Sequence, residues 1–213
     1  MTSGVPLDLV LLVADRDAHE ALDALLSERR PSLGVRNIRY EILGHPRHDP
    51  GCFHEAPALL QTFQARALHA LVIFDHEGSG QDHRPPAEVE EDLRRQLSIS
   101  GWGDRSEVLL VVPELEAWVW SDSPEVDAAL GWEGRSPRLR EWMADSRLWP
   151  SSDPKPPRPK EGFLAALREA RIRRSASIYR QLAERVGLKR CEDPSFARLK
   201  AILCTWFPAE GAA

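Results

Sequence analysis

The chain has 213 residues, of which 42% are hydrophobic and 29% are charged, a composition sufficient for one globular domain with a sizeable core. Its longest apolar runs, around residues 9–14 and 108–113, are too short to cross a bilayer, and residues 1–20 lack a secretion-signal pattern, so we expect a cytoplasmic protein. Three scattered cysteines indicate free thiols rather than a disulfide framework or a thiolate zinc site.

Strands and helices are predicted to alternate along the first half of the chain. Apolar runs of strand length predict strands over residues 6–14, 35–43, 67–74 and 106–113. Apolar residues at helical spacing, or a proline that starts a helix, predict helices over 17–30, 55–67 and 86–97 and from residue 114. This alternation predicts an α/β fold: an open, mainly parallel sheet of about four strands flanked by helices, with a helical C-terminal extension.

The second half of the chain has a different composition. Residues 122–162 are rich in Trp, Pro and Ser and end in DPKPPRPKEG, which favours an extended connection. Helices are expected over 163–172, 175–188 and 193–203. We therefore expect an α/β core over 1–122, an insertion and linker over 123–162, and a basic helical segment over 163–213 that packs on the core.

Charge is distributed unevenly along the chain, although the net charge is only -5. Residues 154–200 contain 13 Lys and Arg against 5 Asp and Glu, a balance of +8, whereas residues 1–153 contain 15 against 27, a balance of -12. Such a division suits a site that gathers divalent cations beside a polyanion such as nucleic acid. The alternative is a solvated helical surface that happens to be rich in arginine.

Three pairs of acidic residues follow predicted strands. They are Asp15 with Asp17, Asp75 with Glu77, and Glu114 with Glu116. Because the carboxyl ends of parallel strands share one edge of a sheet, these six side chains should converge on one crevice. Carboxylates so close together call for a compensating cation, and oxygen ligands suit Mg²⁺ or Mn²⁺. The sequence therefore predicts a carboxylate metal site.

Each pair also has a structural explanation. Asp15 or Asp17 can cap the helix that starts near residue 17, and Glu114 and Glu116 fall in a first helical turn, where negative charge is favourable. Asp75 and Glu77 do not directly precede a predicted helix, and the Gly78-Ser79-Gly80 that follows them allows a ligand to approach the backbone. The pair Asp75 and Glu77 is therefore the strongest candidate of the three.

The segment HPRHDPGCFH (45–54) brings together His45, His48, Asp49, Cys52 and His54. Histidine and cysteine are zinc ligands, but the spacing matches no closed zinc motif, so zinc is the less favoured cofactor. Two prolines and a glycine make a turn with solvated histidines the main interpretation. In a third interpretation, His48 or Asp49 points into the carboxylate crevice and contacts phosphate or metal.

A family resemblance rests on the strand order, the acidic residue after the first strand and Asp75-His76-Glu77 after the third. These features resemble a TOPRIM domain, the metal-binding module of topoisomerases, primases and old-type nucleases. PELEAWVWSD (113–122), KPPRPK (155–160) and SASIYRQLAERVGL with DPSFARL (175–199) are similar to uncharacterised bacterial TOPRIM-like proteins, some found among phage-defence genes. The chain departs from that pattern in having VADRDAHE where a Glu-Gly is usual, and Asp-x-Glu in place of Asp-x-Asp.

The resemblance implies metal-dependent cleavage of phosphodiesters, that is, a nuclease in a defence or repair setting. It implies catalytic roles for Asp15, Asp75, Glu77, Glu114 and Glu116, and Mg²⁺ or Mn²⁺ ligands from Asp15, Asp17, Asp75, Glu77 and Glu116. Candidates for binding the phosphates of nucleic acid are His48, Lys155, Lys160, Arg173 and Arg174.

Two other functions remain open. The altered pattern after the first strand favours a non-catalytic TOPRIM-like subunit that binds a protein partner or nucleic acid in a defence complex. A nucleotide-binding enzyme that uses Gly78-Ser79-Gly80 is less favoured, because the chain has no Gly-x-Gly-x-x-Gly or P-loop pattern.

Overall fold

One open sheet organises the structure, a computed structural model that describes residues 6–121, 123–188, 191 and 193–209. Within these residues four strands pair in the order β2-β1-β3-β4, and every pairing is parallel. The strands are β1 (Leu7–Val13), β2 (Tyr40–Gly44), β3 (Ala67–Asp75) and β4 (Ser106–Val111). The predicted α/β class and parallel sheet are confirmed.

The central strands β1 and β3 are buried on both faces, which explains their continuous apolar sequences. Successive residues of β1 face opposite sides: Leu9 and Leu11 belong to one apolar cluster, and Val10 and Leu12 to the other. The sheet therefore needs helices on both faces to remove these side chains from water.

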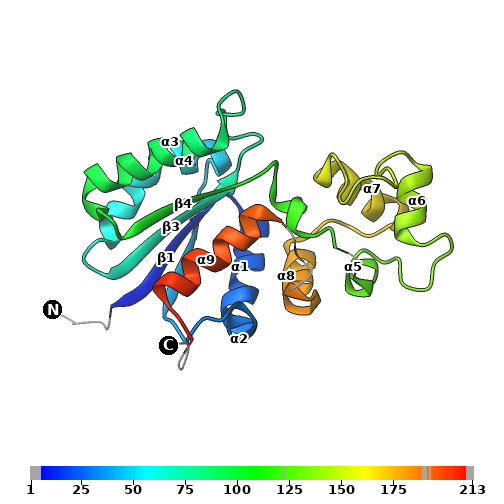
Figure 1. Ribbon diagram of the computed structural model, residues 1–213, viewed down its shortest axis with the longest axis horizontal. Coiled ribbons are helices and arrows are strands. Elements are labelled where there is room, and N and C mark those ends of the chain that lie inside the picture. The colour runs from blue at the N-terminus through cyan, green and yellow to red at the C-terminus, as the bar shows by residue number, and fades with distance from the viewer. Residues whose placement is uncertain (1–5, 122, 189–190, 192, 210–213) are drawn as a thin grey trace.

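Helices cover both faces of the sheet, as Figure 1 shows. On one face lie α3 (His48–Leu60) and α4 (Pro86–Leu97), whose apolar residues pack against Val10, Leu12 and Phe74. On the other face lie α1 (Arg16–Glu28) and α9 (Pro194–Trp206), and α8 (Ala176–Arg185) packs against α1. Shorter helical turns are α2 (Arg30–Leu33), η1 (Gln61–Phe63), η2 (Ser98–Trp102) and η3 (Leu115–Trp118).

Three predicted boundaries differ from the structure. Strand β2 begins at Tyr40 because it pairs only with β1, whose register with β2 starts at Leu9; Val35 instead forms an antiparallel bridge to Pro208. The ELEAWVW segment forms a single turn of 3-10 helix rather than an α-helix. Helix α3 starts at His48, so the turn predicted for HPRHDPGCFH is confined to Pro46 and Arg47, and residues 48–54 are helical instead.

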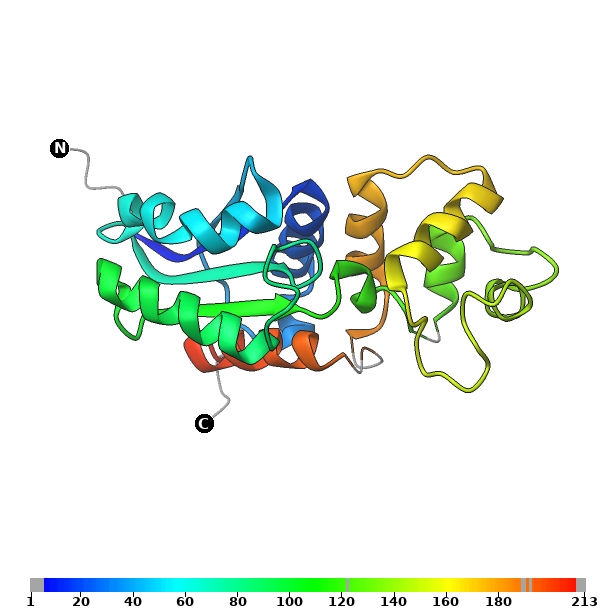
Figure 2. The same cartoon turned by 90° about the horizontal axis from the view of Figure 1, so that it is seen from above.

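A second, helical lobe lies beside the sheet (Figure 2) and contains α5 (Pro124–Ala129), α6 (Leu139–Asp145) and α7 (Pro159–Ala170). Tryptophans build its interior: the rings of Trp132 and Trp142 lie 4.8 Å apart, and Trp132 Nε1 donates a hydrogen bond to the Ala166 carbonyl at 3.2 Å. Trp142 and Trp118 both pack against the apolar core. The segment 163–213, expected to pack on the core as one unit, is divided in the structure. Helix α7 belongs to the lobe, whereas α8 and α9 pack on the sheet side.

No helix among the described residues is both long and apolar enough to span a membrane.

Glycine at position 51 allows α3 to lie against the ring of His45. A Cβ at this position would come within 1.9 Å of His45 Nδ1 and 2.9 Å of Arg47 Cβ. The ring cannot easily yield, because its Nδ1 accepts a hydrogen bond from the Arg47 N–H at 3.1 Å and its Nε2 lies 3.2 Å from Glu55. We therefore expect Gly51→Ala to destabilise the protein by about 1–3 kcal/mol, although alanine favours helix.

Chemical denaturation measures this effect, with Gly44→Ala as the control. A Cβ at Gly44 would meet nothing within 4 Å. Equal stability of the two variants would contradict a packing role for Gly51.

Candidate functional site

A small polar pocket lies beyond the carboxyl ends of β1 and β3, the edge at which α/β sheets bind ligands. Its volume of about 20 Å³ is enough for one water molecule or ion. The sheet side and the helical lobe both contribute to its walls. The polar side chains that line it are four carboxylates, two cations and a phenol: Asp15, Asp17, Asp75, Glu116, Lys160, Arg174 and Tyr179.

The first two carboxylates are positioned by the start of α1. Asp15 is the N-cap residue, and its Oδ1 accepts a hydrogen bond from the Ala18 N–H at 2.9 Å. Asp17 lies in the first turn, where its carboxylate accepts a hydrogen bond from Arg174. The capping role considered for Asp15 is therefore confirmed, and the same residue also lines the pocket. One side chain can serve both purposes because the cap uses only one of its two oxygens.

Asp75 is the last residue of β3, and its surroundings are acidic. Its backbone N–H donates to Asp49 Oδ1 at 2.9 Å, which brings a further carboxylate beside it. Burial raises the pKa of Asp75 well above its usual range, and the charges of Asp49 and Glu116 raise it further, although Lys160 opposes them. The pKa values of Asp17 and Asp49 are also raised, again chiefly by burial. The carboxylates of the pocket outnumber its two cations, Lys160 and Arg174, and burial disfavours the ionised forms of Asp75 and Asp17.

Glu116 is held by a hydrogen bond from Tyr179. Glu116 is 2% exposed, and its Oε1 accepts the Tyr179 hydroxyl at 2.6 Å, while Arg174 Nη2 lies 3.9 Å from the same oxygen. Burial and the charge of Glu116 raise the pKa of Tyr179, so the phenol keeps its proton and remains a donor. This contact connects η3 to α8 and fixes Glu116 at the pocket.

We expect Tyr179→Phe to lower the free energy of unfolding by roughly 1–3 kcal/mol, because the buried Glu116 carboxylate loses its closest donor. Tyr40→Phe is a matched control, since the Tyr40 hydroxyl donates to Asp23 at 2.8 Å in a partly exposed position and should matter less. Urea titration of both variants measures the difference. Equal losses of stability in the two variants would show that the hydrogen bond to Glu116 stabilises the fold no more than the one to Asp23.

Lys160 enters the pocket from the N-terminus of α7. The Lys160 N–H donates to Glu114 Oε1 at 2.8 Å, and Lys160 Nζ lies 3.5 Å from Glu114 Oε2. Burial alone would lower the pKa of Lys160, but the charges of Glu116 and Glu114 raise it on balance, so the ammonium stays charged. Glu114 itself does not line the pocket. Its role in the structure is to hold the start of α7, and thereby Lys160, at the sheet edge.

Comparisons with known proteins add no assignment. No family model matches this chain, and no curated protein or solved structure is significantly similar to it. The function has to be inferred from the pocket itself.

The fit of this pocket to a divalent cation depends on its donors. All four acidic groups offer carboxylate oxygens, the ligands that Mg²⁺ and Mn²⁺ prefer, and burial in this pocket raises the pKa values of two of them, Asp75 and Asp17. Among the described residues, however, no three His, Cys, Asp or Glu side chains are already arranged around one point as a metal site would be. The donor chemistry fits a hard cation, and side-chain rotation has to complete its coordination.

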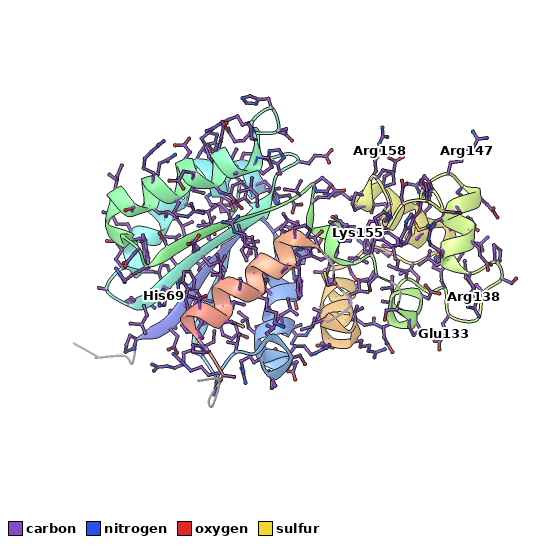
Figure 3. All side chains as sticks on the ribbon, viewed as in Figure 1. His69, Glu133, Arg138, Arg147, Lys155 and Arg158 are labelled. Atoms are coloured by element: carbon purple, nitrogen blue, oxygen red, sulfur yellow. The ribbon has the colours of Figure 1, made fainter. Side chains whose placement is uncertain are left out.

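Besides Glu114, the predicted site residues that lie outside the pocket are Glu77, Lys155, Arg173 and His48. Glu77 is exposed, in a loop folded by its own contacts, such as the hydrogen bond from the Gly78 N–H to Asp82 Oδ1 at 2.6 Å. Lys155 binds the Ala117 carbonyl and Asp193 Oδ2, both at 2.8 Å, and so connects the linker to α9. Figure 3 shows Lys155 near the junction of the lobe and the sheet. Arg173 is exposed and does not line the pocket.

His48 lies in a neighbouring hollow rather than in the pocket. This hollow of about 480 Å³ shares Ala14 and Asp15 with the pocket and also contains His19 and His48. His45 is buried with both ring nitrogens engaged, and Cys52 is buried within the apolar cluster under α3. The side chains of the His and Cys segment are therefore divided between the core and the surface.

Two residues of the site were missed or underweighted by sequence reasoning. In the sequence, Tyr179 is only one residue of a predicted amphipathic helix, and no local pattern distinguishes it. Asp49 was considered together with His48, and the structure shows that Asp49 is the one beside Asp75. Asp49 could have been recognised as a site residue because it is an acidic residue in the first turn of the helix that follows β2.

Proposed function

We propose that this protein is a metal-dependent phosphodiesterase that cleaves nucleic acid. The observation that carries the proposal is the convergence of Asp15, Asp75 and Glu116 with Lys160 and Arg174 at the carboxyl edge of the sheet. Carboxylates with two cations beside them suit a reaction in which a metal ion and a phosphate group meet. The resemblance to TOPRIM proteins supports the same chemistry, and the site we propose is built without Glu77.

The chain's own residues divide the work in this mechanism. Asp15, Asp75 and Glu116 hold the cation, with Asp17 beside them, and Lys160 and Arg174 bind the oxygens of the scissile phosphate. Mg²⁺ or Mn²⁺, when bound, polarises that phosphate and lowers the pKa of the attacking water. Tyr179 donates a hydrogen bond to Oε1 of Glu116, and this contact keeps the carboxylate in position. Glu114 does not line the pocket, and its carboxylate is bonded to the start of α7, so it takes no part in this mechanism.

Isothermal titration of Mg²⁺ and Mn²⁺, followed by cleavage assays on single- and double-stranded DNA and RNA, tests the proposal. The variants are Asp75→Asn and, as a matched control, the exposed Glu77→Gln. We expect wild type and Glu77→Gln to bind metal and cleave, and Asp75→Asn to lose both. The absence of metal binding by wild type at millimolar concentrations, or equal behaviour of the two variants, would refute the proposed site.

A second candidate is a non-catalytic subunit that binds nucleic acid or a protein partner. It is favoured by the engagement of Asp17 and Glu116 with Arg174 and Tyr179, which leaves fewer carboxylates for a metal. Metal binding by wild type without cleavage of any nucleic acid would support it. For either function we propose a cytoplasmic protein in bacterial phage defence or repair, on the resemblance alone.

A further inference from the structure

A second cleft lies in the helical lobe and shares no residue with the carboxylate pocket. Its volume of about 540 Å³ falls in the range of roughly 300–1,000 Å³ that is usual for small-molecule sites. Its walls are formed by Trp120 and Ser121, by the first residues of α5 and α6, and by Trp149, Asp153 and Pro154. It is large enough for a ligand of nucleotide size, and the function proposed above does not use it.

The apolar walls of this cleft are held rigidly. Trp120 and Trp149 pack edge to face with their ring centres 5.4 Å apart, and their ring N–H groups donate to the carbonyls of Pro159 and Asp153. The guanidinium of Arg140 lies 4.1 Å above the Trp149 ring and donates to the Trp149 and Pro150 carbonyls. These groups are already satisfied, so they define the shape of the cleft rather than seek a ligand.

Two polar groups in the lining have no partner in the described part of the chain. Ser121 Oγ is buried and makes no hydrogen bond there. Arg138 is exposed at the start of α6, and its guanidinium has no hydrogen bond or ion pair to another described residue, whereas its backbone N–H donates to Glu141 at 3.1 Å. A buried hydroxyl without a partner is unfavourable, and a ligand that supplies one would relieve it. A cation beside it favours an anionic group on that ligand.

The rest of the lining sets the other properties of the ligand. Two carboxylates, Asp127 and Asp153, also line the cleft, and their negative charge disfavours a simple inorganic anion there. The tryptophan and aliphatic walls favour a planar apolar body. We propose that this cleft binds a planar heterocycle with an anionic group, of the class of the nucleoside monophosphates. The proposal does not depend on the activity of the carboxylate pocket.

Isothermal titration of the full chain with nucleoside monophosphates, adenosine and inorganic phosphate tests this proposal. We expect saturable one-to-one binding of at least one monophosphate, weaker binding of adenosine, and no saturable binding of inorganic phosphate. Arg138→Gln and Ser121→Ala should each weaken the binding about tenfold, as loss of one hydrogen bond to a charged group would. Ser121→Ala should leave the melting temperature of the free protein unchanged or raised, because the hydroxyl has no partner to lose.

Two control variants locate the binding. Arg147→Gln removes another arginine of the lobe that is not part of the cleft, and Figure 3 shows Arg147 and Arg138 on different sides of the lobe. Lys160→Gln removes one of the two cations of the carboxylate pocket. Both controls should bind the monophosphate as wild type does. The proposal is overturned if no monophosphate binds, if Arg138→Gln and Ser121→Ala bind normally, or if Lys160→Gln is the variant that loses binding.

Discussion

The Asp75→Asn protein should be more stable than wild type at neutral pH, by roughly 0.5–2 kcal/mol, the gain that is common when a functional site is relieved of strain. Burial and the neighbouring charges of Asp49 and Glu116 disfavour the ionised Asp75 side chain. An amide of the same shape removes that charge without leaving a cavity. The residue on which the proposed activity most depends is therefore expected to destabilise the metal-free fold.

The pH dependence of this effect has a definite sign. Because the pKa of Asp75 is higher in the folded than in the unfolded chain, the folded state binds more protons at any pH between the two values. The contribution of Asp75 to stability is therefore lost as the pH rises above 3.8, the ordinary value for this side chain. Asp17 and Asp49, whose pKa values are also raised, act in the same direction. Wild type should lose stability on that rise, and Asp75→Asn should lose less.

Urea denaturation of both proteins between about pH 5 and pH 8, with Glu77→Gln as the control, measures this difference. The Glu77 side chain is exposed, so its removal should leave the pH dependence of wild type unchanged. Saturating Mg²⁺ should reverse the order, because a ligand that binds only the folded wild type stabilises it. A destabilised Asp75→Asn protein in the absence of metal would show that the carboxylate is compensated within the fold.

The fold was largely predictable because its signals are local. The continuous apolar runs of β1 and β3 are typical of strands buried on both faces, and the proline at position 86 starts α4 where it was expected. The prediction failed where a neighbour decided the structure. Strand β2 is shortened because Arg36 and Arg39 bind Asp8 near the start of β1. Helix α3 is extended because Gly51 allows it to pack on His45.

The site was predictable only in part, for a reason of geometry. The rule that strand ends share one edge brought Asp15, Asp75 and Glu116 to one pocket, since it depends on topology alone. It could not determine the direction of individual side chains in the loops. Glu77 is two residues beyond Asp75, where the chain has already turned away, and its backbone N–H donates to the Pro113 carbonyl at 2.9 Å. The cations come from the start of α7 and from the segment that precedes α8, whose positions no local pattern specifies.

Arg173 and Arg174 show this limit most directly, because they are adjacent in the sequence and chemically identical. Only Arg174 lines the pocket, where it binds Asp17 and approaches Glu116. In the absence of a metal it compensates the same carboxylates that we expect to hold one. Metal ion and guanidinium should therefore compete for these oxygens, and the arriving cation should release Arg174 to bind phosphate.

We accordingly expect Arg174→Gln to have opposite effects on metal binding and on cleavage. The Mg²⁺ affinity should rise about fivefold, or about 1 kcal/mol, because the guanidinium is partly exposed and its repulsion is screened. Cleavage of nucleic acid should fall about 100-fold or more, the usual loss when a group that stabilises developing phosphate charge is removed. Isothermal titration and initial rates measure the two effects, and circular dichroism verifies that the variant is folded.

Arg173→Gln is the matched control, since it removes the same charge one residue away and outside the pocket. It should change neither quantity more than about twofold, apart from a weak salt-dependent effect on the binding of long substrates. Equal losses of activity in the two variants would mean that the segment contributes only general positive charge. If Mg²⁺ binding weakened in Arg174→Gln, the guanidinium would be orienting the carboxylates rather than competing for them, and the exchange of Arg174 from carboxylate to phosphate would be ruled out.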